Sequence, residues 1–177
     1  LNTNPTVTID GNAETTNPQT PSNAYSAERT METADTQGQI AFAISNIIDR
    51  AGNTASTVSA TNDGTSVTFD SNAPTLTGLT MASDNNFDND NLTSLAKSGD
   101  LVTLTFYTNE TAQTPTALIA GETATVTGSA SSWVATKTMD DTDSDGSIAL
   151  VIDFKDLAGN SGTQATSVLS GSAVTYD

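Results

Sequence analysis

Apolar and polar residues alternate in short runs along the second half of the chain, which is the pattern of half-buried β-strands. In the clearest run, from Ile148 to Phe154, every second residue is large and apolar, so one face of this strand is expected to be buried. Turn residues such as Ser98-Gly99-Asp100 and Gly128-Ser129 separate the runs. The pattern predicts strands over residues 76–81, 101–106, 117–119, 124–126, 133–139, 148–154 and 163–176, the last stretch with a break near Ser170-Gly171.

The number and spacing of these strands, together with the amino-acid usage, indicate the fold class. Thr, Ser, Asn and Asp are abundant while Lys and Glu are few, which disfavours helices. About seven short strands within roughly 107 residues are typical of an immunoglobulin-like sandwich. We therefore expect an all-β chain that folds as an immunoglobulin-like Greek-key β-sandwich.

The chain also repeats itself at an offset of 107 residues. Asp49-Arg50-Ala51-Gly52-Asn53 returns as Asp156-Leu157-Ala158-Gly159-Asn160, and Val67-Thr68-Phe69-Asp70 returns as Val174-Thr175-Tyr176-Asp177. Such self-similarity indicates tandem repeats, each the size of one sandwich.

The two repeats are not equally complete. Residues 71–177 are expected to form a complete repeat, and residues 1–70 an incomplete one that has the later strands alone. Pro115 follows Pro74 by 41 residues in the second repeat, whereas four residues of this sequence precede the matching Pro5. Two explanations stay open: either the sequence is cut from a longer array, or another molecule donates the missing strands.

Composition narrows the chemistry that the chain can perform. It has 5 Lys and Arg against 21 Asp and Glu, a net charge of −16, and neither Cys nor His. Disulfides, thiolate–zinc sites and nucleophiles that depend on His are therefore excluded. The negative charge repels phosphate backbones and anionic lipids, and no apolar run is long enough for a membrane span, so neither nucleic acid nor direct membrane insertion is expected. Oxygen ligands for hard cations remain.

Acidic loops at one end of the second repeat are candidate calcium ligands. An immunoglobulin-like topology brings together the linker before the repeat, the loop after its second strand and a turn near its last strands. Carboxylate, amide and carbonyl oxygens from three loops match the ligands that Ca2+ prefers. The expected ligands are Asp70, Asn109, Glu110, Asp156 and Asn160, with Asp49 and Asn53 at the matching turn of the first repeat. The alternative, in which the Asp and Asn of each turn bond the local backbone, is compatible with this one.

A second candidate calcium loop runs from Asp141 to Gly146. Asp141, Asp143 and Asp145 have the Asp-x-Asp-x-Asp-Gly spacing of a calcium loop. The pattern departs at its twelfth position, where Ile152 replaces the bidentate Glu, and the matching stretch of the first repeat keeps one of the three carboxylates. A solvated acidic turn is the alternative.

Three lysines of the second repeat raise a different possibility. Lys97, Lys137 and Lys155 could form internal amide links to Asn, as in some surface pilin domains. The region of the first repeat that matches Lys155 contains no Lys. We therefore expect these side chains to face solvent.

An ordered set of short motifs resembles a known family. The motifs are Ala73-Pro74-Thr75-Leu76, Ser98-Gly99-Asp100-Leu101, Thr108-Asn109-Glu110, Trp133-Val134-Ala135, Asp156-Leu157-Ala158-Gly159-Asn160 and Val174-Thr175-Tyr176-Asp177. In this order they resemble the tandem bacterial immunoglobulin-like repeats of large secreted surface adhesins and biofilm-matrix proteins. The resemblance implies an extracellular, non-enzymatic spacer whose partners are neighbouring immunoglobulin-like repeats of the same or an identical chain, often with Ca2+ stiffening the joints.

Two functions of different classes follow as hypotheses. The first is a structural spacer in a calcium-stiffened stalk on a cell surface. The second is a subunit of a self-assembling extracellular fibre, in which one chain completes the sandwich of its neighbour by strand exchange. A carbohydrate-binding or glycosidase-associated module is less well supported, because the chain has one Trp and three Tyr to line a sugar-binding groove. We do not expect an enzyme.

Overall fold

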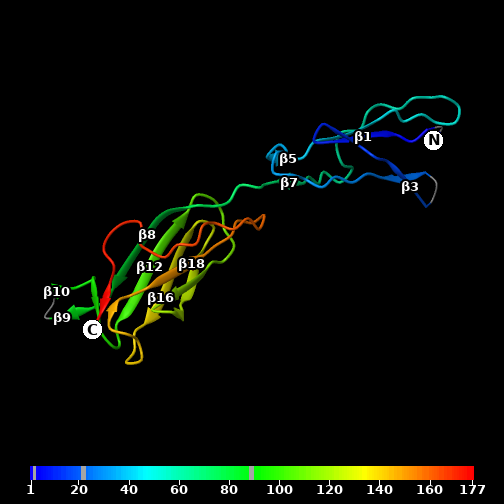
Figure 1. Ribbon diagram of the computed structural model, residues 1–177. Coiled ribbons are helices and arrows are strands. Elements are labelled where there is room, and N and C mark those ends of the chain that lie inside the picture. The colour runs from blue at the N-terminus through cyan, green and yellow to red at the C-terminus, as the bar shows by residue number, and fades with distance from the viewer. Residues whose placement is uncertain (2, 21–22, 88–89) are drawn as a thin grey trace. The chain divides into compact units, whose positions relative to one another are not determined.

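The computed structural model describes residues 1, 3–20, 23–87 and 90–177, which form two compact units, residues 1–71 and 72–177 (Figure 1). The described residues form strands and turns. The all-β fold class that the alternating pattern predicts is therefore confirmed. Within the described part of the chain, no helix is long and apolar enough to cross a lipid bilayer.

The second unit contains two main antiparallel sheets. The larger sheet has the order β15-β16-β12-β8 and the smaller the order β14-β13-β18. In Figure 1 the strands β8, β12 and β16 run side by side. The strand bounds are β8 Leu76–Ser83, β12 Leu101–Thr108, β13 Thr116–Ile119, β14 Glu122–Thr123, β15 Thr125–Ser129, β16 Ser132–Thr138 and β18 Leu150–Asp153.

Side chains of both sheets meet in one hydrophobic core. Leu79, Leu104 and Phe106 of the larger sheet and Ile119 and Ile152 of the smaller sheet are each 0% exposed. Along β12 every second residue is buried, as a strand with one face against a core requires. The second unit is thus a sandwich-like pair of sheets around a shared core.

Short strands complete the second unit. They are β9 (Asn86–Phe87), which pairs with β10 (Asp90–Asn91), and β11 (Leu95–Ala96), which runs parallel to β19 (Thr175–Tyr176); β19 also pairs with β17 (Gly146–Ser147). The stretch predicted as strand over 163–176, with a break near Ser170-Gly171, is strand in β19 and irregular for most of the remainder. Between a single bridge at Ala165 and β19 the chain is irregular, because this stretch is rich in small polar residues and Gly171 adopts a φ of 80°.

The first unit consists of short strands in separate small sheets. β1 (Thr6–Ile9) lies between β2 (Asn12–Glu14) and β6 (Phe42–Ser45), and two further antiparallel pairs join β3 (Asn17–Gln19) to β4 (Ala24–Ser26) and β5 (Gly38–Gln39) to β7 (Thr68–Phe69). The hydrophobic core cluster of the described chain lies entirely in the second unit. The apolar side chains of β1 and β6 remain partly exposed.

Backbone pairing in the first unit has a parallel in the second. Ile9 of β1 lies opposite Phe42 of β6, and Ile119 of β13 lies opposite Leu150 of β18. The turns after β1 and after β13 both begin with two residues of positive φ. The pairing of β5 with β7 likewise has the same antiparallel form as that of β17 with β19.

Candidate functional site

The turn that follows β18 is built around the buried carboxylate of Asp156. Asp156 is 1% exposed, and its Oδ1 accepts hydrogen bonds from the backbone N–H groups of Gly159 (2.6 Å) and Asn160 (2.8 Å). Its Oδ2 accepts a bond of 2.7 Å from the side-chain amide of Asn160. The local backbone bonding that the sequence allows as one interpretation of the Asp-x-Ala-Gly-Asn turn is therefore present.

This bonding sets the ionisation of Asp156. Burial taken alone raises the pKa of the carboxyl, but the hydrogen bonds from the Asn160 side chain and from the backbone of Asn160 and Gly159 outweigh it and lower the pKa below the ordinary 3.8. Asp156 is therefore held as a carboxylate at neutral pH, which is the form that a cation binds.

The loop after β12 packs against the same turn. The backbone of Ala112 pairs with Asp156, and the side-chain amide of Gln113 donates a hydrogen bond of 2.8 Å to the Asp156 carbonyl. As a result, Glu110 and Asp156 each present a carboxylate oxygen within 4.8 Å of the other. Two like charges at this separation repel each other, and a shared divalent cation would relieve the repulsion.

Asn109 has a structural role in the same loop. Its Oδ1 accepts a hydrogen bond of 2.7 Å from the backbone N–H of Thr75, and its own N–H donates to the Thr75 carbonyl at 3.0 Å. These two bonds attach the residue before β8 to the loop that carries Glu110. Asp70, another expected ligand, belongs to the first unit and precedes Thr75 by five residues.

The matching turn of the first unit has similar bonding in an exposed setting. Asp49 Oδ1 accepts from the N–H groups of Ala51 (2.9 Å) and Asn53 (2.8 Å), and Oδ2 accepts from the Asn53 side chain at 2.8 Å. The Asn53 side-chain bond is the main cause that lowers the Asp49 pKa. Asp49 is exposed, whereas Asp156 is buried.

The acidic loop before β17 is organised differently from a calcium loop. Asp143 accepts hydrogen bonds on both carboxylate oxygens from Lys137 Nζ, at 2.8 and 2.6 Å, and one from the backbone N–H of Asp140 at 2.9 Å. Asp141 and Asp145 are exposed. Within the described ranges, the three carboxylates at 141, 143 and 145 do not gather within 4.8 Å of one another.

Lys137 does not face solvent, so that expectation is wrong for this residue. Its side chain is 7% exposed because it shares the inward face of β16 with Trp133 and Ala135. Burial lowers the pKa of the ammonium, but the hydrogen bonds and charges of Asp143 and Glu122 outweigh it and raise the pKa above the ordinary 10.5. Glu122 completes the cluster with an oxygen 3.4 Å from Nζ.

The first unit contains an equivalent ion cluster that sequence reasoning missed. Arg29 pairs with Glu14 at 3.3 Å and with Asp35, and both Glu14 and Asp35 lie 108 residues before their counterparts in the Lys137 cluster. Arg29 itself precedes Lys137 by 108 residues. The signal was available, because all three charges recur at one offset.

Buried acids should make the second unit sensitive to low pH. Asp100 is buried, and although burial raises its pKa, hydrogen bonds from the Lys97 backbone and side chain and from Asn85 lower it overall. A lowered folded-state pKa contributes stability that is present above the unfolded value near 3.8 and is lost as the pH falls through the folded value.

We therefore expect Asp100→Asn to be less stable than the parent chain at pH 5. The difference in their free energies of unfolding should shrink as the pH falls from 5 toward 2. Urea unfolding followed by the fluorescence of Trp133 measures this difference, and comparing the two proteins cancels the shared effect of discharging the other carboxylates. A deficit that stays constant over this range would contradict the assignment of the lowered pKa to Asp100.

Comparison with protein families and with curated proteins identifies no relative. No protein-family model matches the chain, and a search of curated proteins finds no match.

Proposed function

We propose that the chain is part of a tandem array of immunoglobulin-like Greek-key repeats that serves as an extracellular spacer. The observation that carries this proposal is the recurrence of structure at an offset of 107–108 residues. The Asp–Asn turn recurs with the Asn donating to the Asp carboxylate from both its backbone and its side chain, and the ion cluster recurs with the same arrangement of acid, base and acid. Repetition of structural detail along a chain favours a scaffold built from stacked units.

Calcium is the proposed ligand at the start of the second repeat. Glu110 and Asp156 supply two carboxylates, and Asn109 and Asn160 lie beside them in the same segments. Asp70 is the proposed third carboxylate, because a linker of five residues up to Thr75 spans at most about 17 Å and Thr75 is bonded to Asn109. A cation held by ligands before and after residue 71 would restrict the linker between consecutive repeats.

The outside of a cell is the compartment that this chemistry favours. The local backbone and side chains already occupy several lone pairs of the ligand oxygens. We therefore expect these ligands to bind Ca2+ weakly. Extracellular modules operate with dissociation constants of roughly 10⁻⁴ to 10⁻³ M, which suits calcium levels outside cells. The partners in this proposal are neighbouring repeats of the same or an identical chain.

Calcium titration tests the proposal. Ca2+ at about 100 times its dissociation constant should stabilise the second unit by about 2.7 kcal/mol, and EDTA should reverse the effect. The midpoint of thermal unfolding is the measurement, with isothermal titration to count ions. Glu110→Gln should remove most of the response, whereas Glu28→Gln, which removes the same charge from an exposed position of the first unit, should leave it intact. A midpoint that ignores millimolar Ca2+ in the parent chain would refute the calcium proposal.

A subunit of a self-assembling fibre is the second candidate, favoured by the partly exposed apolar residues of the first unit. In such a fibre, strands of one chain would complete the first unit of the next. A fibre subunit should assemble from the purified chain without any other protein, whereas a spacer should stay monomeric. Sedimentation over a range of concentrations distinguishes the two.

A further inference from the structure

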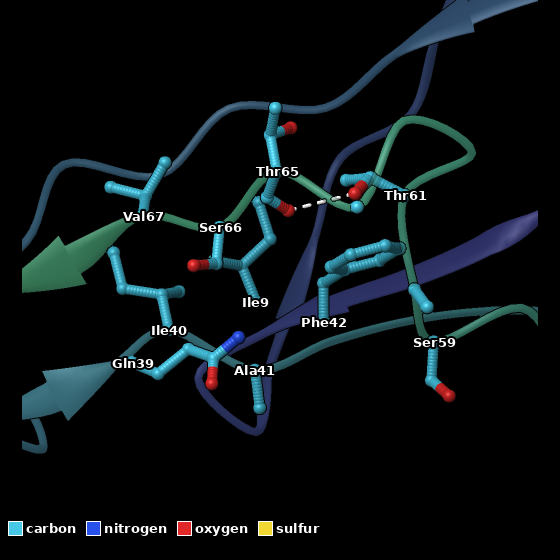
Figure 2. Close-up of a pocket in the computed structure, with 12 residues that line it drawn as sticks. Ile9, Gln39, Ile40, Ala41, Phe42, Ser59, Thr61, Thr65, Ser66 and Val67 are labelled. Atoms are coloured by element: carbon cyan, nitrogen blue, oxygen red, sulfur yellow. Dashed lines mark hydrogen bonds between the residues drawn. The ribbon is translucent and has the colours of Figure 1, made fainter.

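An open apolar groove lies along the first unit, between the β1–β6 sheet and the segment from Ser59 to Val67. Its volume is about 630 Å³. Figure 2 shows Ile9, Ile40, Phe42 and Val67 around this space, with the ring of Phe42 beneath the segment that carries Thr61 and Thr65. Val67 is 67% exposed, so the groove places apolar side chains in contact with water.

Equivalent positions of the second unit are covered. Ile119 and Leu150, which face each other as Ile9 and Phe42 do, are 0% and 4% exposed, and Val174, which follows Val67 by 107 residues, is 0% exposed. The side chains that share their core include those of β8 and β12. The second unit thus indicates which structural element belongs over such a surface.

The first unit also has an incomplete sheet where that element would pair. In the second unit β16 is hydrogen-bonded to β15 on one side and to β12 on the other. In the first unit β4, which carries Tyr25 where β16 carries Trp133, is paired with β3 only, within the described residues. Among those residues, nothing in the first unit corresponds to β8 and β12.

Charge also favours strands of this type. β8 and β12 contain no charged residue, so the net charge of −16 does not oppose the approach of segments like them. Their alternating apolar residues supply the side chains that fill the second core.

We propose that the groove of the first unit is the docking site for an antiparallel strand pair with the sequence pattern of β8 and β12, supplied from outside residues 1–71. The strand that corresponds to β12 adds to the open edge of β4, and the apolar side chains of the pair cover Ile9, Phe42 and Val67. This inference rests on the repeat relation proposed above and is independent of calcium.

The test adds the strand pair to the full chain. A copy of residues 72–114 is fused directly before Pro5, because Thr114-Pro115 of the second unit corresponds to Asn4-Pro5. In EDTA, hydrogen exchange over residues 24–26 and 42–45 should slow by about 100-fold relative to the unfused chain, as expected when an exposed sheet gains a core. Binding of an apolar dye should fall in parallel.

A matched fusion carries Leu104→Asn and Phe106→Asn in the added copy alone, and it should leave the groove as exposed as in the unfused chain. The proposal would be overturned if hydrogen exchange over residues 24–26 and 42–45 were unchanged in the first fusion while the unfolding transition reported by Trp133 fluorescence remained intact. Protection in the unfused chain that disappears on dilution, while β16 keeps its own protection, would also overturn the proposal, because the grooves of two copies would then cover each other.

A second experiment tests the proposal even if the fusion does not fold. A polypeptide of residues 72–114 is titrated into the isotopically labelled chain, and resonances of Ile9 and Phe42 should shift. Phe42→Asp should abolish the shift, and an unperturbed spectrum in the parent chain would count against the proposal. Because both arms are run without calcium, their failure leaves the calcium titration unaffected.

Discussion

Replacing Lys137 with Met should destabilise the second unit by about 3–5 kcal/mol. The side chain of Asp143 is 2% exposed, and Lys137 Nζ donates to both of its carboxylate oxygens. Met has nearly the length of Lys but no charge, so the variant leaves a buried carboxylate without its counter-ion, and this is the source of the cost. Urea unfolding followed by fluorescence measures the loss, and the single Trp of the chain, Trp133, lies on the same face of β16.

Two controls distinguish charge loss from packing loss. Lys137→Arg should retain most of the stability, because Arg29 occupies the matching place in the first unit. The double variant Lys137→Met, Asp143→Leu should recover much of the loss, since a buried ion pair can be replaced by apolar residues at little cost. If Lys137→Met cost less than about 1 kcal/mol, Asp143 would have to be hydrated or protonated in the variant.

The ion pair also has a predicted behaviour at high pH. A folded-state pKa that is raised contributes stability that is fully present below the unfolded value near 10.5 and is lost as the pH rises through the folded value. The stability advantage of the parent chain over Lys137→Met should therefore persist to pH 10 and shrink above it, within the same set of unfolding measurements.

Asp156→Ala should destabilise the second unit by about 3 kcal/mol in EDTA. The change removes the acceptor for the N–H groups of Gly159 and Asn160 and for the Asn160 side chain at a buried position. Unsatisfied buried donors cost about 1–3 kcal/mol each, and several donors on one acceptor do not add fully. The free energy of unfolding from urea titration is the measurement.

Asp49→Ala is the matched control in the first unit. The N–H groups of Ala51 and Asn53 lose their acceptor there, but the position is exposed, so water takes its place and the effect on stability should be much smaller. Equal effects at the two positions would show that burial does not set the strength of the Asp–Asn turn.

Local sequence pattern predicted much of the secondary structure for a physical reason. In β12 and β18 side chains alternate between the core and the outer surface, and this alternation is visible in the sequence itself. The stretch before β19 lacks that alternation, and its path is decided by contacts with distant segments, such as the Leu169 N–H that donates to the Leu79 carbonyl. Sequence periodicity carries no information about such contacts.

The candidate site likewise has a part that the sequence predicts from local pattern and a part that depends on contacts between distant segments. The Asp156–Asn160 turn was predictable, because its donors and acceptor lie within five residues of one another. The proximity of Glu110 to Asp156 was an expectation drawn from topology, and it depends on the pairing of Ala112 with Asp156 across the fold.

By itself, the amino-acid sequence determined an all-β chain, its internal offset, its acidity and the chemistry of its Asp–Asn turns, since each of these depends on composition or on neighbours along the chain. The tertiary structure alone decided that Lys137 is buried between Glu122 and Asp143, that the Asp156 carboxylate is buried while Asp49 is exposed, and that the first unit has an uncovered apolar groove. The physical reason is that burial is a property of the layers packed over a residue, and those layers come from distant parts of the chain.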